Sequence, residues 1–175
     1  MNETKIGVGP DKKDDALEGH ERKILGVCSS GGHLIQMEAL ARMGVPLDCI
    51  LSPSQIEVNV HHVLIPDCNI RSPLKTLRCA FTLAKELIRF RPDVIISTGA
   101  APGGIALVLG TALRCRTVWI DSIANAEKAS LTGRLVRPFA KLWISQWKNV
   151  AEEEKGVYIG KIFSFFDSRN TTSIR

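Results

Sequence analysis

The fold is decided by the stretch Ile24-Leu-Gly-Val-Cys-Ser-Ser-Gly-Gly-His33-Leu-Ile-Gln-Met-Glu-Ala-Leu40. An apolar run is followed by a turn of two serines and two glycines, and apolar residues then recur at the spacing of a helix. This order predicts a strand, a tight turn and a helix. His33 ends the turn, where backbone N–H groups and the positive end of the helix face the space in which an open α/β sheet binds its ligand.

The rest of the chain repeats this alternation of strands and helices. Short apolar runs predict further strands at 47–51, 61–65, 93–97, 115–120, 141–146 and 157–159. Ser72 and Pro73 begin a long helix that ends before Pro92, and a second helix is predicted at 103–113. Alternating strands and helices with short connections predict an α/β fold, a Rossmann-like parallel sheet with helices on both faces.

The length of 175 residues suits a single domain with a sizeable core. Residues 1–22 are charged and polar and are predicted to be a disordered leader, residues 23–163 form the Rossmann-like domain, and residues 164–175 are predicted to be a flexible tail. Residues 1–23 hold five basic and six acidic groups, so the remainder carries eighteen basic groups against twelve acidic ones. A basic body suits an anionic partner such as a phospholipid surface, a lipid pyrophosphate or a nucleotide sugar.

The segment Val94–Leu113 carries no charge and has the length of a membrane span. Its middle, Ser97-Thr-Gly-Ala-Ala-Pro-Gly-Gly104, would break a spanning helix and leave polar backbone groups in lipid. We therefore interpret it as a buried strand, a loop and a buried helix. The chain is expected to be soluble or bound at a membrane surface.

Several site classes have no support in the sequence. It contains neither Gly-Lys-Ser nor Gly-Lys-Thr, and no Gly-x-Gly-x-x-Gly follows the first strand, which argues against an ATPase and a nicotinamide dehydrogenase. The five cysteines, at 28, 49, 68, 79 and 115, form no Cys-x-x-Cys pair and indicate reduced thiols rather than disulfides or a metal site. We expect no metal, no cofactor and no nucleic-acid partner.

The candidate site lies where the strands at 24–28, 93–97 and 115–120 end, because their carboxyl ends converge on one crevice of such a sheet. His33 and Asp121 are the candidate catalytic residues, since an imidazole and a carboxylate supply acid or base. Glycine turns let backbone N–H groups approach a phosphate or a sugar closely. The candidate substrate-binding residues are Ser29, Ser30, Gly31, Gly32, Thr98, Gly99 and Ser122. The alternative is that the glycines only tighten turns, His33 caps a helix and Asp121 ends a strand.

Two stripes of side chains run along the predicted helix after Ser72. Apolar residues at helical spacing are expected to face the core: Leu74, Leu77, Phe81, Ala84 and Ile88, in a stripe widened by Ala80, Leu83, Leu87 and Phe90. Basic residues share another face and are predicted to contact anionic lipid headgroups: Lys75, Arg78, Lys85 and Arg89. The alternative for the basic stripe is a solvated helix face.

A set of short motifs occurs in unbroken order over residues 23–163. The motifs are Ser29-Ser-Gly-Gly-His33, Ser97-Thr-Gly-Ala100, Trp119-Ile-Asp-Ser122, Ser130-Leu-Thr-Gly-Arg134, Gln146-Trp147 and Val157-Tyr-Ile-Gly160. Together they resemble the PssD/CpsF-type subunits of exopolysaccharide glycosyltransferases. That family is related to the membrane subunit of the eukaryotic dolichol-pathway N-acetylglucosaminyltransferase and, more distantly, to the N-terminal half of the peptidoglycan enzyme MurG.

The resemblance implies the acceptor-side half of a split, inverting GT-B glycosyltransferase, unlikely to act alone. A separate donor-binding subunit would hold the nucleotide sugar, and the acceptor would be a polyprenyl-pyrophosphate-linked sugar. The chain would then be cytoplasmic and peripheral at the inner face of the cytoplasmic membrane. His33 matches the histidine that closes the glycine turn of the family and is implied to be the general base or to orient the acceptor. Asp121 stands where relatives usually have glutamate, which leaves its role open.

Two other functions are compatible with the same residues. In the first, the chain is a non-catalytic subunit that stabilises or enhances the transferase, and its partner subunit holds every catalytic group. In the second, the chain is a stand-alone enzyme that acts on a nucleotide-linked sugar, such as an epimerase. The eukaryotic relatives carry an N-terminal membrane helix, whereas the N-terminal residues here are polar, so attachment to a membrane is expected to be peripheral or through a partner.

Overall fold

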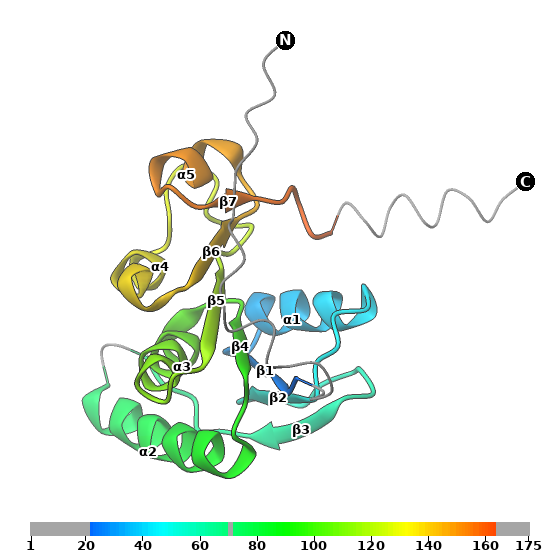
Figure 1. Cartoon of the computed structure of the whole chain (residues 1–175), viewed down its shortest axis with the longest axis vertical. Helices are drawn as coiled ribbons and strands as arrows, with labels where there is room; N and C mark the ends of the chain where they lie inside the picture. Colours follow the sequence, from blue (N-terminus) through cyan, green and yellow to red (C-terminus); the bar gives the residue numbers. More distant parts are fainter. Residues whose placement is uncertain (1–21, 70–71, 164–175) are drawn as a thin grey trace, which may run out of the picture.

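The computed structural model describes residues 22–69 and 72–163, which form one seven-stranded parallel sheet in the order β3-β2-β1-β4-β5-β6-β7 (Figure 1). The strands are β1 (Ile24–Val27), β2 (Cys49–Ser52), β3 (His61–Leu64), β4 (Val94–Ser97), β5 (Arg116–Ile120), β6 (Leu142–Ser145) and β7 (Val157–Tyr158). The predicted Rossmann-like sheet is confirmed. The predicted flexible tail, and the predicted leader up to residue 21, lie outside the described residues.

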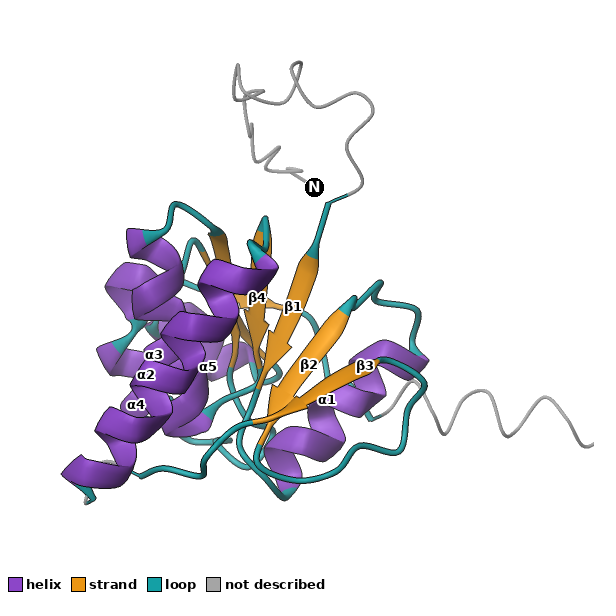
Figure 2. Ribbon diagram, turned by 90° about the horizontal axis from the view of Figure 1, so that it is seen from below, coloured by secondary structure: helices purple, strands orange, loops and turns teal. Residues whose placement is uncertain are grey.

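Helices cover both faces of the sheet, as predicted (Figure 2). They are α1 (Gly32–Arg42), α2 (Pro73–Phe90), α3 (Ala100–Ala112), α4 (Leu131–Leu135) and α5 (Lys148–Glu153), with a 3₁₀ turn at Arg137–Phe139. On one face, α1 packs Met37 and Leu40 into a core with Ile50. On the other face, the core contains Leu83 of α2 and Leu107 of α3.

The uncharged segment Val94–Leu113 folds as strand β4, a turn and helix α3, as predicted. Helix α3 begins at Ala100, three residues earlier than expected, because Gly99 (φ 133°) and Ala100 (φ 63°) turn the chain sharply at the end of β4. Helix α5 was not predicted: it is a six-residue helix that buries only Val150 and Ala151, too few for a periodic pattern. In the parts of the chain that the structure describes, no helix has both the length and the hydropathy to cross a membrane.

The centre of the core stripe predicted for α2 is wrong, whereas Leu83 and Leu87 of its flank are buried as predicted. Most of the central apolar members are exposed: Leu74 82%, Leu77 68%, Phe81 75% and Ile88 60%. The residues that α2 buries against the sheet are Cys79, Leu83 and Leu87. They lie on roughly the opposite side of the helix. Apolar residues occupy more than half of the circumference of α2, so the hydropathy pattern does not say which part of them faces the sheet.

The strand order reverses between β1 and β4, which are neighbours in the sheet although α1, β2, β3 and α2 separate them in the sequence. Their register pairs Val27 with Ser97, so the two strands end at the same level. The loops that follow them therefore leave the sheet side by side. A parallel sheet binds ligands at such a reversal point.

Candidate functional site

The turns after β1 and β4 are joined by His33. Its Nδ1 lies 2.8 Å from the carbonyl oxygen of Thr98, and Thr98 Oγ1 donates a hydrogen bond of 2.7 Å to the carbonyl oxygen of His33. Because a carbonyl oxygen only accepts, Nδ1 of the neutral imidazole carries the hydrogen, and Nε2 holds a lone pair. The two reciprocal bonds fix the half-buried ring in one orientation. His33 is thus set up to accept a proton at Nε2.

Gly99 provides the surface on which the imidazole rests. A Cβ placed at Gly99 would overlap the Cε1 and Nδ1 atoms of His33, and the φ of 133° at Gly99 is one that other residues rarely adopt. Gly31, with φ 68°, makes the corresponding turn before α1. The structure therefore brings His33, Thr98 and Gly99 together, as the sequence predicted, and the substitution of either glycine would disturb the contact.

Two helices begin at this edge without side-chain caps. Gly31 precedes α1 and Gly99 precedes α3, and neither helix has an acidic residue in its first turn. The first backbone N–H groups of a helix lack partners within the helix, and they carry partial positive charge. Ser30 and Gly32 are exposed beside them, whereas the buried Ser29 donates a 3.3 Å hydrogen bond to the carbonyl oxygen of Ser30. This edge suits the binding of an anionic group.

Asp121, at the end of β5, has a different environment. It is 1% exposed, and its carboxylate accepts four hydrogen bonds. Oδ1 accepts from Ser130 Oγ (2.6 Å) and Trp119 Nε1 (3.2 Å). Oδ2 accepts from the backbone N–H of Ser130 (3.0 Å) and from Asn125 Nδ2 (3.2 Å). Every oxygen is therefore occupied by the protein itself, and Asp121 holds the loop that leads to α4.

The sequence did not single out Ser130 and Gln146 as functional residues, although both lie in the quoted motifs. Ser130 caps α4, where its Oγ accepts a 2.9 Å bond from the N–H of Gly133. Gln146 donates from Nε2 to the carbonyl oxygen of Asp121 (3.1 Å), and its Oε1 accepts from the N–H of Ile162 (2.9 Å). The spacing from Ser130 to Gly133 is a usual helix-start signal, but no local pattern reveals the partners of Gln146. Ser122, predicted to bind substrate, is half-buried and accepts a 3.3 Å bond from the N–H of Ala124.

Cys28 is a further polar group at the end of β1, close to Thr98. Burial, together with the negative charge of Glu38, raises the pKa of the Cys28 thiol to about 12. Cys28 is thus a neutral thiol at physiological pH and is not a reactive nucleophile. Across residues 22–69 and 72–163, no three His, Cys, Asp or Glu side chains are grouped closely enough to hold a metal ion.

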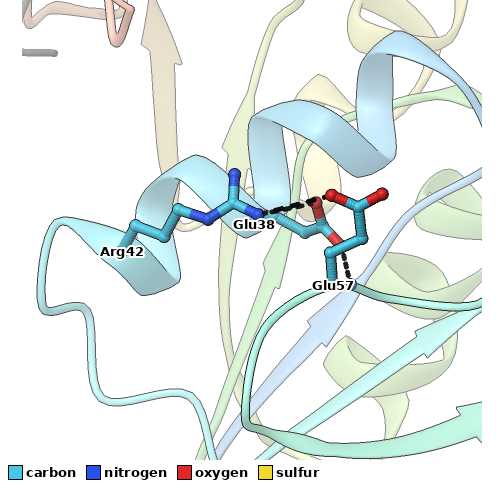
Figure 3. Close-up of polar contacts among 3 residues, drawn as sticks. All are labelled: Glu38, Arg42 and Glu57. Atoms are coloured by element: carbon cyan, nitrogen blue, oxygen red, sulfur yellow. Dashed lines mark hydrogen bonds and ion pairs between the residues drawn. The ribbon is translucent and has the colours of Figure 1, made fainter.

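The helix that carries His33 is held in place by a buried carboxylate (Figure 3). Glu38 of α1 accepts a hydrogen bond from the backbone N–H of Glu57, in the loop between β2 and β3. Arg42, one turn later in α1, lies 3.6 Å from Glu38 and 3.8 Å from Glu57. This cluster ties the loop to α1, and no local pattern in the sequence predicts it, because Glu38 and Glu57 are 19 positions apart in the chain.

A profile of the family described as "Oligosaccharide biosynthesis protein Alg14 like" matches residues 64–162, more than half of the chain. The chain belongs to this family. The matched residues run from the end of β3 to Ile162, so they include Thr98, Gly99 and Asp121 of this Alg14-like protein, whereas the turn with His33 precedes them.

A relative from Eremothecium gossypii, named UDP-N-acetylglucosamine transferase subunit ALG14, is 29% identical over 92 residues. The match covers 47% of this Alg14-like chain and 41% of that relative. The chain thus spans less than half of the length of the curated relative.

Solved structures share the fold of the Alg14-like chain. MurG from Acinetobacter baumannii has a TM-score of 0.56 and 17% identity, with coverage of 73% of this chain and 43% of MurG. UDP-N-acetylglucosamine 2-epimerase from Rickettsia bellii has a TM-score of 0.66 and 9% identity, with coverage of 89% and 49%. At these identities the likeness extends to the fold alone.

Proposed function

We propose that the chain is the acceptor-binding subunit of a two-component, inverting GT-B glycosyltransferase of the PssD/CpsF type. The complex transfers a sugar from a nucleotide sugar to a polyprenyl-pyrophosphate-linked glycan in polysaccharide biosynthesis. The name of the Eremothecium relative favours N-acetylglucosamine as the sugar and uridine diphosphate as the leaving group. One observation carries the proposal. The ring of His33 packs on Gly99, its Nδ1 is hydrogen-bonded to the carbonyl oxygen of Thr98, and the uncapped starts of α1 and α3 lie beside it.

In the proposed reaction, the acceptor hydroxyl lies against Nε2 of His33. As its oxygen attacks the anomeric carbon of the donor sugar, Nε2 takes the hydroxyl proton. The bond from the anomeric carbon to the nucleoside diphosphate breaks, and the leaving oxygen keeps the electron pair, so the configuration inverts. The N–H groups at the starts of α1 and α3 bind the pyrophosphate of the acceptor.

Asp121 has a supporting role in this proposal. Because its four hydrogen bonds come from Trp119, Asn125 and Ser130, the carboxylate keeps the loop before α4 beside the end of β5. The residues Ser29, Ser30, Gly31, Gly32 and Ser122 remain proposed contacts of the acceptor.

The donor-binding partner can be tested by reconstitution. The purified chain, the candidate partner and their mixture are each incubated with UDP-N-acetylglucosamine and a polyprenyl-pyrophosphate-linked sugar. We expect sugar transfer by the mixture and by neither component alone. Robust turnover by the chain alone would contradict the two-component assignment, and tight binding of a sugar nucleotide to the isolated chain would favour the stand-alone enzyme. Intact turnover after His33→Ala would favour the non-catalytic subunit.

We also propose that α2 docks on the anionic inner face of the cytoplasmic membrane. Leu74, Leu77 and Phe81 project from α2 into solvent, next to a basic stripe whose four members are exposed: Lys75, Arg78, Lys85 and Arg89. Arg89 forms a 3.8 Å ion pair with Glu86. Apolar side chains beside cations are the pattern of helices that lie in a lipid headgroup layer.

Sedimentation with vesicles tests this surface. Arg78→Glu and Lys85→Glu should each weaken binding to vesicles rich in anionic lipid by about fivefold or more, since each basic residue near such a surface contributes about 1 kcal/mol. Phe81→Ser should weaken binding by removing an inserted ring. Lys141→Glu, an exposed residue outside α2, is the matched control. Equal sedimentation of the α2 variants and the control would refute membrane docking through α2.

A further inference from the structure

A groove lies on the face of the sheet that α2, α3 and α4 cover, and it has no role in the proposed sugar transfer. Helix α3 forms its floor with Ala101, Ile105 and Val108, and α2 and α4 form its walls with Ala80 and Leu135. Its volume is about 420 Å³. Helices α2, α3 and α4 lie side by side on this face of the sheet in both views (Figures 1 and 2).

The lining of the groove offers almost no hydrogen-bonding groups. Apart from Thr76 and Thr132, it consists of alanine, glycine, valine, leucine and isoleucine. The hydroxyl of Thr76 already donates a 2.8 Å bond to the carbonyl oxygen of Asn69. A ligand in this groove must therefore be apolar over its whole length, because any polar group would lose its bonds to water without replacement.

The position of the groove connects it with the candidate site. Ala101 is two residues after Gly99, and Thr132 is two residues after Ser130, which binds Asp121. A Cβ at Gly104 would lie 2.8 Å from Thr132 Cγ2, so α4 packs tightly on α3 near this end. One end of the groove thus lies within the first turn of α3, close to its uncapped start.

The outer boundary of the groove is apolar. Leu135 is 59% exposed on α4, and Leu77 of α2 is exposed next to Thr76. The exposed cations Lys75 and Arg78 lie on other faces of α2, because residues one or two positions from Thr76 and Ala80 point away from the side that lines the groove. A ligand with an apolar chain and an anionic head is complementary to the apolar groove and the positive start of α3.

We infer that the groove between α2, α3 and α4 binds the first isoprene units of the polyprenyl-pyrophosphate acceptor. This inference rests on the proposed function and adds a binding site for the lipid part of the substrate. The pyrophosphate lies at the start of α3, and the chain runs from it along α3 toward the exposed apolar residues of α2. A long isoprenoid chain then leaves the groove into the membrane on which α2 docks.

The binding test uses the full chain and geranylgeranyl pyrophosphate below its micelle concentration. We expect it to bind at least about tenfold more tightly than inorganic pyrophosphate, since the groove removes several CH₂ and CH₃ groups from water. Ala80→Phe, which fills the groove, should weaken binding of the isoprenoid by about tenfold and leave binding of pyrophosphate unchanged. Ala84→Phe, one turn further along α2 and outside the lining, is the matched control.

A second variant covers the case in which Ala80→Phe does not fold. Leu135→Asp places a charge at an exposed position of the groove wall, and Leu113→Asp places one at an exposed position outside it. Only Leu135→Asp should weaken isoprenoid binding. Equal binding of the groove variants and their controls, or no preference for the isoprenoid over pyrophosphate, overturns the inference. Loss of self-association or of partner binding in Ala80→Phe, with isoprenoid binding intact, assigns the groove to a protein contact and also overturns it.

Transfer assays separate this inference from the proposed function. In the reconstituted enzyme, Ala80→Phe should raise the KM for a polyprenyl-linked acceptor and leave the KM for an acceptor with a truncated lipid unchanged. Equal KM values for the variant and the wild type on both acceptors refute the groove while the transferase function stands. If the wild-type mixture transfers no sugar, the proposed function fails, and the direct binding of geranylgeranyl pyrophosphate still decides the groove.

Discussion

The turn after β1 ends in a titratable side chain and the loop after β5 begins with one, yet His33 and Asp121 differ in the hydrogen-bonding capacity that they have left for a ligand. His33 uses Nδ1 to bind the carbonyl oxygen of Thr98 and keeps the lone pair of Nε2. Asp121 uses both carboxylate oxygens for four hydrogen bonds inside the protein. A titratable group at a strand end is therefore a candidate for chemistry only after its hydrogen bonds within the protein have been counted.

The glycines that contact His33 and Asp121 differ as well. Gly99 lies under the imidazole and leaves it half-buried at the edge of the sheet. Gly133 instead closes over the carboxylate, since a Cβ there would lie 3.0 Å from Asp121 Oδ1 and 2.8 Å from Trp119 Nε1. One glycine makes room for the ring that we propose as the base, whereas the other allows a buried polar network to pack.

The largest expected effect is on stability, from Asp121→Ala. The substitution leaves the N–H groups of Trp119 and Ser130 buried without acceptors, so we expect the free energy of unfolding to fall by about 3 kcal/mol. Urea denaturation followed by circular dichroism measures this change, and Asp121→Asn, which keeps an acceptor oxygen, should lose less. Unchanged stability combined with lost transfer would make Asp121 a catalytic residue and would remove the contrast with His33.

The next effect is on turnover, from His33→Asn. The amide of asparagine can still donate to the carbonyl oxygen of Thr98, but it has no basic nitrogen, so kcat of the reconstituted enzyme should fall by about 100-fold, or about 2.7 kcal/mol. The free energy of unfolding should change by less than about 0.5 kcal/mol. Comparison with His33→Ala separates the loss of the base from the loss of the Thr98 contact. Wild-type kcat in the asparagine variant would show that Nε2 takes no proton.

The smallest expected effect is on stability, from Ser130→Ala, and it tests how much Ser130 contributes to the hydrogen bonds around Asp121. This variant removes the cap of α4 and one of the four bonds to Asp121, so we expect a loss of about 1 kcal/mol in the free energy of unfolding and little change in kcat. A double-mutant cycle with Asp121→Asn should give a coupling energy above about 0.5 kcal/mol, because the two side chains are in direct contact. Additive losses would mean that Ser130 is not the main partner of Asp121.

Much of the site was predictable from local patterns. The glycine turn before His33 and the glycine at the end of β4 were recognisable because each stands between an apolar run and a helical pattern, at the end of a strand where such a sheet binds ligands. The bond from His33 to Thr98 was not predictable in detail, since it joins residues 65 positions apart. The saturation of Asp121 was hidden for a similar reason: Asn125 and Ser130 become its partners only through the path of the loop after β5.

Helix α2 shows the limit of hydropathy patterns. Its apolar residues predicted a helix correctly, but they placed the centre of the buried side on the exposed residues Leu74, Leu77 and Phe81, because the pattern has apolar residues around most of the circumference. The side that faces the sheet is chosen by packing against α3 and the strands, which selects Cys79, Leu83 and Leu87. The same packing leaves Leu74, Leu77 and Phe81 in solvent and creates the groove beside them.

The amino-acid sequence by itself determined the alternation of strands and helices, the parallel sheet and the glycine turns, because these follow from hydropathy periods and backbone freedom over a few residues. Only the tertiary structure decided which nitrogen of His33 stays available, which carboxylate is used up, which face of α2 is exposed and where the groove lies. These properties depend on contacts between segments that are distant in the chain, and such contacts exist only once the sheet has brought the ends of β1, β4 and β5 to one edge.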